Sequence, residues 1–476
     1  MEVNMSSSSK ASIRITSLLD ENSFVEIGAR VSARSTDFNL KPDQAPSDGV
    51  ITGYGVIDGN LVYVYSQDSS VLGGSVGEMH AKKIAKLYDL AIRTGSPIIG
   101  FVDSTGIRLQ ESTDALEAIG TIYAKQAEAS GVIPQITAVF GTCGGGLSIL
   151  PAMSDFSFMA DDAKLFVNSP NAIKGNYEEK NDTASAKAKA ESGNADATGS
   201  EDEIIAEIRT LVGLLPCNNE DTAFADCEDD LNRASSNVAS GKADPAVVAA
   251  DIADDGLFFE VKRAFAPEMV AGLVRLNGTT TGIVANRTAK FDESGKKSAE
   301  YDSVLTPAGC DKAAKFVSFC DAFNIPVITL TNVTGFASCE CCEKKIAGAA
   351  AKLAFAFADA DVPKINVVIG NAMGSAYNVM NSKGIGADLT IALPDSKIGI
   401  MDAKLAASII ADGKSADEVA DTAKKFDALQ NSVDSAASRG YIDEIVNPED
   451  LRKYLIGAVE MLYTKQAIVE KKHGTV

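Results

Sequence analysis

Two stretches of the chain repeat each other at a constant separation of 229 residues. The match needs no gap from about residue 81 to residue 146 and keeps lysine, proline and glycine positions in one register. The aligned positions are Lys83 with Lys312, Pro97 with Pro326, Thr105-Gly106 with Thr334-Gly335, Pro134 with Pro363, Gly141 with Gly370, and Gly145 with Gly374. A period this long is typical of a duplicated domain and not of a solenoid. The sequence therefore predicts two homologous domains.

Both copies show the same order of patterns. A helical pattern leads into a proline and a short apolar run, and an alanine-rich helical pattern leads into a second apolar run that ends in glycines. Continuous apolar strands that alternate with helices are typical of an α/β fold with a buried, mostly parallel sheet. We therefore predict an α/β protein with these parts: a disordered or short N-terminal extension (1–20), a first domain (21–215), an acidic linker (216–256) and a second domain (257–476).

The acidic residues are concentrated in one segment. The chain has 44 basic and 65 acidic residues, a net charge of −21, and residues 171–256 carry −12 of it with 7 basic and 19 acidic residues. This charge argues against a nucleic-acid partner, which needs a basic surface. Within the segment, residues 176–200 are polar and are expected to form a loop or mobile flap. The N-terminus lacks an apolar signal region, and no long apolar run occurs, so we expect a soluble, cytoplasmic protein.

Cysteine and histidine give little support for metal or triad chemistry. The chain has only two histidines, His80 and His473. His80 falls at the start of a helical pattern, where a structural or capping role is expected. Of the eight cysteines, Cys339, Cys341 and Cys342 form a C-x-C-C cluster. A zinc site usually needs a second pair of ligands, so we expect an ordinary loop there and no metal in this subunit, with metal or redox chemistry at the cluster as the alternative.

The glycine-rich turns at 141–146 and 370–377 are the strongest candidate sites. Each follows an apolar strand and precedes a helix, so small residues would let a ligand oxygen approach unpaired backbone N–H groups. A P-loop is excluded because neither turn contains Gly-Lys-Ser/Thr, and the spacing for a dinucleotide site is absent. The alternative is that the glycines serve only close packing. Two such turns without a triad favour oxyanion holes that stabilise a thioester enolate and a second anion on a cofactor.

Residues 66–112, 130–159, 313–336 and 362–389 carry several motifs that resemble the biotin-dependent acyl-CoA carboxyltransferase family. Members include propionyl-CoA carboxylase beta subunits and the alpha subunits of methylmalonyl-CoA and glutaconyl-CoA decarboxylases. The resemblance covers the chain from about Ile13 onward. It implies two tandem crotonase-like domains and an assembly of six subunits. It also implies an acyl-CoA held by the first domain and biotin, on a separate carrier protein, held by the second.

The resemblance implies a substrate-assisted reaction. In the family, carboxybiotin releases CO2, the ureido nitrogen removes the thioester α-proton, and the enolate captures CO2. The expected partners are a biotin carboxyl carrier protein and either a biotin carboxylase or a membrane decarboxylase subunit. Neither the acyl group nor the direction of the reaction follows from the sequence.

The resemblance also assigns site residues. The expected catalytic positions are Gly145 and Gly146 in the first domain, and Gly374, Ser375 and Ala376 in the second. The expected positions around the acyl-CoA and biotin are Gly106, Arg108, Gly141, Gly335, Phe336, Tyr377 and Asn378. Two of these have alternatives. Arg108 either meets a CoA phosphate or pairs with Glu111 on a solvated face, and Tyr377 either lines the biotin pocket or packs in the core.

Three departures from the family pattern leave other functions open. The usual glycine at position 375 is serine, an aspartate linked to acyl-chain choice is Asn378, and the loop after Phe336 has lost its proline and glycine. The alternative is therefore a non-catalytic scaffold subunit in a carboxylase or decarboxylase complex. A biotin-independent hydratase or hydrolase ranks last, because Glu111 is its only candidate carboxylate near the first turn.

Overall fold

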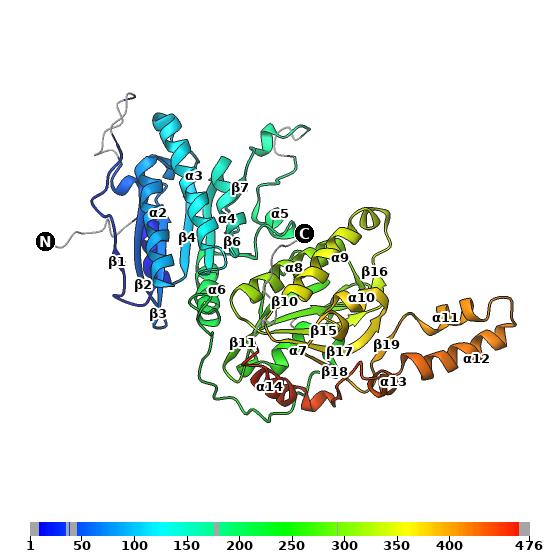
Figure 1. Ribbon diagram of the computed structural model, residues 1–476. Helices are drawn as coiled ribbons and strands as arrows, with labels where there is room; N and C mark the ends of the chain where they lie inside the picture. Colours follow the sequence, from blue (N-terminus) through cyan, green and yellow to red (C-terminus); the bar gives the residue numbers. More distant parts are fainter. Residues whose placement is uncertain (1–8, 35–37, 39–44, 176–179, 293, 466–476) are drawn as a thin grey trace. The chain divides into compact units, whose positions relative to one another are not determined.

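The computed structural model describes residues 9–34, 38, 45–175, 180–292 and 294–465. His473 lies outside these residues. The chain divides into two compact units, residues 1–222 and 223–476. Each unit is an α/β fold built on one eight-stranded sheet. Figure 1 shows the strands and helices of both units. No helix within the described residues is long and apolar enough to cross a lipid bilayer.

The first sheet runs in the order β1-β2-β3-β4-β5-β6-β8, and β7 also pairs with β5. Its strands from β3 onward are parallel, with antiparallel β1 and β2 at one edge. The strands are β1 (Val25–Glu26), β2 (Val50–Ile57), β3 (Asn60–Gln67), β4 (Ile98–Ser104), β5 (Gln135–Gly144), β6 (Phe156–Ala160), β7 (Lys164–Phe166) and β8 (Ala197–Gly199). The helices are α1 (Lys10–Leu18), α2 (Glu78–Thr94), α3 (Ser112–Ala129), α4 (Ile149–Met153), α5 (Ala186–Glu191) and α6 (Glu201–Leu214).

The second sheet has the same order, β9-β10-β11-β15-β17-β18-β20, and β19 pairs with β17 as β7 does with β5. Its strands are β9 (Phe259–Glu260), β10 (Met269–Leu276), β11 (Thr279–Asn286), β15 (Val327–Val333), β17 (Lys364–Met373), β18 (Leu389–Ala392), β19 (Lys397–Gly399) and β20 (Glu444–Ile445). Two small ladders lie outside it: β12 (Ala289–Phe291) with β13 (Lys297–Glu300), and β14 (Val304–Leu305) with β16 (Gly335–Phe336).

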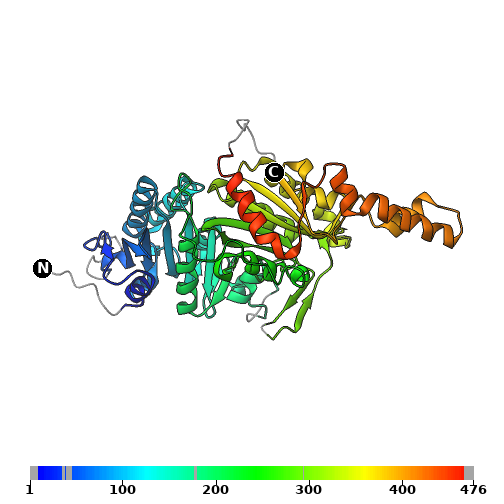
Figure 2. The ribbon, with the colours of Figure 1, turned by 90° about the horizontal axis from the view of Figure 1, so that it is seen from below.

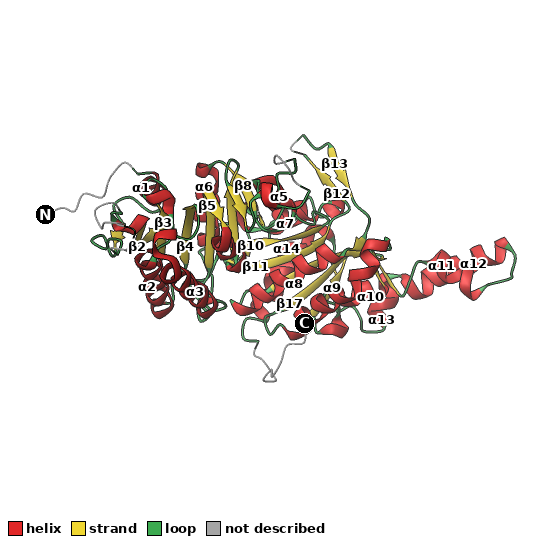
Figure 3. Ribbon diagram, turned by 90° about the horizontal axis from the view of Figure 1, so that it is seen from above, coloured by secondary structure: helices red, strands yellow, loops and turns green. Residues whose placement is uncertain are grey.

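The helices of the second unit are α7 (Pro245–Ile252), α8 (Pro307–Ala322), α9 (Glu340–Asp359), α10 (Gly374–Val379), α11 (Ala403–Ile410), α12 (Ala416–Phe426), α13 (Val433–Ser438) and α14 (Leu451–Met461). Figure 3 shows α2 and α3 on one face of the first sheet and α1 and α6 on the other. In the second unit α8 packs against α9, and α14 lies across the opposite face of the sheet (Figure 2). α11 and α12 form a hairpin that projects from this unit.

Both sheets begin with a tight hairpin of the same kind. The two-residue loops Asp58-Gly59 and Asn277-Gly278 have positive φ at both positions, between 48° and 84°. Asx-Gly pairs favour this turn because both positions need positive φ, and the twist of the turn matches the right-handed twist of the flanking strands. Each hairpin thus places an antiparallel strand pair at the same point of its unit. The two units therefore repeat one arrangement of elements, which supports the duplication predicted from the 229-residue separation.

The predicted domain bounds differ from the structure at both ends of the repeat. The predicted N-terminal extension contains α1, whose Ala11, Ile15 and Leu18 are buried in the first unit. The predicted linker contains α7, whose Val248 and Ile252 belong to the core of the second unit. These helices precede β1 and β9 and open their units in the same way. The apolar faces of α1 and α7 are short and the flanking sequence is polar, so composition alone does not reveal these two helices.

The predicted loop or flap at 176–200 is also partly wrong. Residues 176–179 lie outside the described residues, but α5 and the edge strand β8 follow them, and β8 pairs with β6. The buried apolar side chains here are alanines: Ala184, Ala186, Ala190, Ala195 and Ala197. Alanine buries little area per residue, so a segment whose apolar packing uses only alanines has the composition of a loop.

Carboxylates of the acidic segment neutralise arginines inside the second unit. Arg452 of α14 is fully buried, donates to Asp254 at 2.7 Å and lies 3.3 Å from Asp229. It also donates to the carbonyl of Ile252, the last residue of α7. Arg287 pairs with Asp244 at 2.7 Å in the same way. Part of the acidity of residues 171–256 is therefore structural, because these carboxylates anchor the segment to the sheet.

Replacing Arg452 by methionine should strongly destabilise the second unit. The change leaves two largely buried carboxylates without their cation, which costs about 3–5 kcal/mol in comparable sites. The neighbouring Lys453 is a matched control, because its ion pair with Asp450 is exposed and contributes little to stability. The measurement is the urea midpoint by circular dichroism. Equal shifts for Arg452→Met and Lys453→Met would contradict this account.

Candidate active site

In each unit the central strand turns into a helix through a glycine with left-handed backbone. Gly145 follows β5 with φ +65°, and Gly374 follows β17 with φ +58°. A 3-10 turn (Gly145–Ser148) continues into α4 in the first unit, whereas α10 begins at Gly374 in the second. First-turn N–H groups of a helix have no partner within the helix. Both turns therefore present backbone donors where the central strand ends.

Two glycines inside the strands make room for a neighbouring polar side chain. A Cβ atom on Gly141 would collide with the carboxylate of Asp103 on β4, and one on Gly370 with the amide of Asn332 on β15. In the second unit the Asn371 N–H donates to the Asn332 amide oxygen at 3.0 Å. Gly141 was predicted to be near a ligand, and its first role in the structure is this close packing.

Two hydroxyl groups orient the peptides of the first turn. The Tyr123 hydroxyl donates to the Gly146 carbonyl at 2.5 Å, and the Ser148 hydroxyl donates to the Gly145 carbonyl at 2.7 Å. Because a trans peptide places N–H and C=O on opposite sides, each bond also fixes the direction of the following N–H. Tyr123 lies on α3, far from the turn in sequence. Sequence reasoning missed it, and a tyrosine among alanines gives no signal of this contact.

The loop before α3 adjoins the first turn and is held by buried charges. Gly106, with φ +114°, packs against Gly144, and its N–H donates to the Ser104 hydroxyl at 3.2 Å. Next to it, Arg108 pairs with Asp48 and, at 2.9 Å, with Glu111. The side chains of all three charged residues are fully buried. The loop is thus fixed from the inside of the unit.

Arg108 does pair with Glu111, as one interpretation expected, but in the interior of the unit. The guanidinium neither pairs on a solvated face nor is available to a CoA phosphate, because both carboxylates and the Ser75 carbonyl occupy it. Glu111 is likewise engaged, since it also accepts the Glu78 N–H at 2.7 Å. A buried, paired carboxylate is poorly placed for acid/base catalysis. The hydratase or hydrolase interpretation therefore loses its candidate residue.

His80 belongs to the same buried cluster and has a structural role. One ring nitrogen lies 2.9 Å from the Asp48 carbonyl and the other 3.1 Å from the Gln67 side-chain amide. Burial, reinforced by the positive charge of Arg108, lowers the pKa of His80 from 6.5 to about 3. The ring is therefore neutral near pH 7, as its hydrogen bonds to a carbonyl and an amide require.

The turn in the second unit is the more exposed of the two. Ser375 and Asn378 are exposed, Gly374 is half-buried, and the Ala376 side chain is buried. Tyr377 packs against a core cluster formed by Val368, Ala372, Ala392, Ile398, Val433, Ala436 and Ile442. Burial raises the pKa of Tyr377 to about 12. Of its two interpretations, core packing is the one that the structure displays.

Gly335 and Phe336 form β16, a short strand that contacts α10. Both residues are half-buried, and a Cβ on Gly335 would meet no atom within 4 Å. They thus lie beside the second turn, as the resemblance implies. The structure brings Gly106, Gly145 and Gly146 together in one unit and Gly335, Phe336 and 374–378 in the other.

Two α/β units with crotonase-like sheets, each with a backbone donor turn after its central strand, define the class of this protein. The sequence profile described as "Carboxyl transferase domain" matches residues 5–476. The chain therefore belongs to the carboxyl transferase family, and the predicted family membership is confirmed.

Curated relatives match over nearly the full length. The propionyl-CoA carboxylase beta chain of Saccharopolyspora erythraea is 37% identical, over 97% of this chain and 89% of the relative. The methylmalonyl-CoA decarboxylase alpha subunit of Veillonella parvula is 38% identical, over 97% and 92%. Among solved structures, the transcarboxylase 12S hexamer with methylmalonyl-CoA bound matches with a TM-score of 0.90 at 35% identity, over 98% of this chain and 92% of that one.

The neutral state of His80 predicts a pH dependence. The folded pKa lies below the value of about 6.5 in the unfolded chain. The stability that the neutral ring contributes is therefore complete above pH 6.5 and is lost as the pH falls toward 3. We expect the free energy of unfolding to fall more steeply between pH 6.5 and 4 in the wild type than in His80→Gln. Urea titrations across this range measure it, and parallel curves would contradict the assignment.

Proposed function

We propose that this chain is a carboxyltransferase subunit that moves a carboxyl group between biotin on a separate carrier protein and a short-chain acyl-CoA. The observation that carries the proposal is the pair of glycine turns, one per unit, in a chain of this family. Its relatives act on propionyl-CoA or methylmalonyl-CoA by name. Methylmalonyl-CoA is therefore the first substrate to test.

In the first unit, the N–H groups of Gly145 and Gly146 are the proposed donors to the thioester carbonyl oxygen. Removal of the α-proton or loss of the carboxyl group places negative charge on this oxygen, and fixed donors stabilise that charge more than the neutral carbonyl. The Ser148 hydroxyl holds the Gly145 carbonyl, whose peptide carries the Gly146 N–H, so this donor need not reorganise during the reaction. Tyr123 holds the next peptide of the turn through the Gly146 carbonyl. No side-chain nucleophile is required.

In the second unit, the N–H groups among Gly374, Ser375 and Ala376 are the proposed donors to biotin. The residues present fit such a group, because the turn is solvent-accessible at Gly374 and Ser375, and the serine retains its backbone N–H. Biotin, when bound, would supply the ureido nitrogen that carries the carboxyl group. Gly335 and Phe336 would border it, and Asn378 is the exposed side chain closest in sequence to the donors.

The proposed partners follow from the same function. The 476 residues contain no Ala-Met-Lys-Met biotin attachment sequence, so biotin must arrive on another polypeptide. By analogy with the transcarboxylase 12S hexamer, six copies of the chain would assemble. A biotin carboxylase or a membrane decarboxylase subunit would complete the system and set its direction.

The first test is decarboxylation of methylmalonyl-CoA with free biotin. We expect slow CO2 release that requires both the assembled protein and biotin. In Gly145→Ala, and separately in Gly374→Ala, a Cβ at positive φ should displace the donors and lower the rate about 10²–10³-fold. Gly120→Ala on α3 is the control, because a Cβ there meets no atom within 4 Å.

The same assay separates the proposal from its alternative. A scaffold subunit would show no turnover and no heat of acyl-CoA binding in calorimetry, yet would co-purify with a second carboxyltransferase chain. The exposed Ser375 and Asn378 are the substitutions that motivate this alternative. Undiminished rates in both glycine variants would refute the oxyanion-hole assignment while leaving the family unaffected.

Tyr123 offers a finer test of how the peptide next to the donors supports the turn. Tyr123→Phe removes the hydrogen bond to Gly146 and should lower kcat about tenfold, the equivalent of one hydrogen bond, with little change in KM. Tyr54→Phe, on β2 in the same unit, is the matched loss of a hydroxyl. A change confined to KM, or an equal effect of Tyr54→Phe, would rule out a positioning role.

A further inference from the structure

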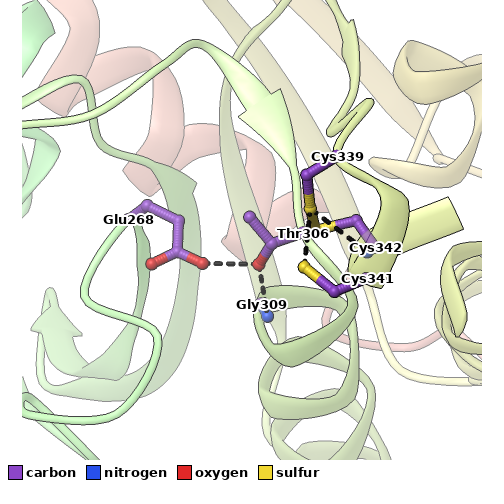
Figure 4. Close-up of a disulfide and its surroundings, with 6 residues drawn as sticks. All are labelled: Glu268, Thr306, Gly309, Cys339, Cys341 and Cys342. Carbon is purple, nitrogen blue, oxygen red and sulfur yellow. Dashed lines mark hydrogen bonds between the residues drawn. A yellow bond between two sulfur atoms is a disulfide. The ribbon is translucent and has the colours of Figure 1, made fainter.

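Three cysteine sulfurs meet at the start of α9. Cys339 is the N-cap of this 20-residue helix, and its sulfur accepts the Cys342 N–H at 3.1 Å. Cys339 and Cys342 form a disulfide, with their Cα atoms 5.1 Å apart, and the Cys341 sulfur lies 3.0 Å from the Cys339 sulfur (Figure 4). Of the two interpretations of this cluster, an ordinary loop or metal or redox chemistry, the ordinary loop is therefore wrong, because a Cys-x-x-Cys pair spans the first helical turn.

The cluster differs from the other cysteines in its access to solvent. Cys143, Cys310 and Cys320 are buried, and burial raises the pKa of the thiols of Cys143 and Cys310 to about 12, which makes them inert. Cys339 and Cys341 are exposed. A helix N-terminus stabilises a thiolate, and Cys-x-x-Cys pairs at such positions are typical of thiol–disulfide chemistry.

The cluster occupies the place that buried charges occupy in the first unit. The 229-residue separation aligns Arg108 with Ala337 and Glu111 with Glu340, at the starts of α3 and α9. The second unit thus lacks the arginine, and Glu340 is exposed and pairs with Lys344. In the second unit the cysteine cluster therefore stands where the first unit has its buried ion pair, and a disulfide holds this loop.

The loop between β16 and α9, which contains the cysteine cluster, lies next to the turn at Gly374. β16 pairs with β14, and the Ala337 N–H donates to the Leu305 carbonyl at 2.9 Å. Thr306, next in the chain, caps α8 and donates to Glu268 at 2.5 Å, beside the cysteines in Figure 4. α10, which begins at Gly374, contacts both β16 and α9. A change in the conformation of the cysteine cluster can therefore affect the Gly374 turn through the contacts of α10 with β16 and α9.

We propose that Cys339, Cys341 and Cys342 form a thiol–disulfide exchange site for low-molecular-weight disulfides, which fastens the start of α9 when oxidised and releases it when reduced. The effect on the Gly374 turn rests on the proposed function, whereas the exchange chemistry does not. Cys341 keeps one thiol available beside the disulfide, so the oxidised site can still react.

The exchange balances with a small disulfide as the oxidant. A thiolate of the reduced pair attacks one sulfur of the small disulfide, forms a mixed disulfide and releases one small thiol. The second protein thiolate then attacks the protein sulfur and releases the other small thiol. Two electrons pass from the cysteine pair to the small disulfide, and the two protons of the pair end on the released thiols. A small thiol in excess reverses both steps.

The test is alkylation of the full-length native protein after equilibration in buffers of varied glutathione to glutathione disulfide ratio. Peptide mass spectrometry should show that two of the three cluster thiols are lost on oxidation, with a Cys339–Cys342 link. The link should persist in Cys341→Ser and disappear in Cys342→Ser. Cys227→Ser, at a half-exposed cysteine elsewhere in the second unit, should match the wild type.

Two results would overturn the proposal. One is complete alkylation of all three thiols at every ratio. The other is protection without a disulfide that a chelator removes, because the three sulfurs lie close enough to hold a metal ion and a metal site would then replace the exchange site. Hydrogen exchange of residues 335–346 gives an independent readout: it should slow on oxidation in the wild type and not in Cys342→Ser.

Decarboxylation assays in both redox states keep the two proposals distinct. Oxidation should change the biotin-dependent rate in the wild type and leave Cys342→Ser unchanged. Exchange without any decarboxylation would count against the proposed function alone. Decarboxylation with an equal rate in both states, despite a mapped disulfide, would refute the coupling to the Gly374 turn.

Discussion

Each unit depends on a central strand that only glycine allows to pass its neighbour. Gly141 and Gly370 run so close to Asp103 and Asn332 that a methyl group on either glycine would displace the side chain of its neighbour. A few residues later the chain reverses through a left-handed glycine and opens a helix. The close approach and the reversal together bring the backbone donors to the end of the sheet. The proposed chemistry is therefore set by main-chain geometry, which explains how a chain with two histidines can be an enzyme.

Buried arginines hold the elements around these turns. Arg108 fixes the loop beside the first turn, and Arg452 ties α14 to the acidic segment. Arg14, on α1, reaches Asp103 at 3.3 Å and Glu201 of α6 at 2.7 Å, and so joins the first helix to the strand beside Gly141. Each guanidinium bridges segments distant in sequence, and its removal would leave its carboxylate partners without a positive charge. The negative charge of the chain is in part the counterpart of these cations.

The sequence predicted the repeat, the fold class, the family and the glycine turns, because period, apolar runs and small residues are local signals. It did not predict the contacts that depend on packing. α7 resembled a linker because its apolar face is only two turns long, and Arg108 resembled a surface residue because its partner Asp48 lies 60 positions away. Tyr123 was missed for the same reason. The cluster of Cys339, Cys341 and Cys342 was recognised, but the disulfide between Cys339 and Cys342 was not predicted, because the third cysteine leaves more than one pairing open.

The two units have diverged most in how their turns are supported. In the first, hydroxyls hold both carbonyls and buried ions hold the adjoining loop, so the turn is fixed from within. In the second, Lys352 replaces Tyr123 in the repeat, an exposed Ser375 leads the helix, and sulfur closes the loop. Buried ion pairs are out of reach of dissolved thiols and disulfides, whereas exposed cysteines react with them. A rigid turn suits a substrate bound the same way in every cycle, and a turn supported from the surface suits a group that must enter and leave on a carrier.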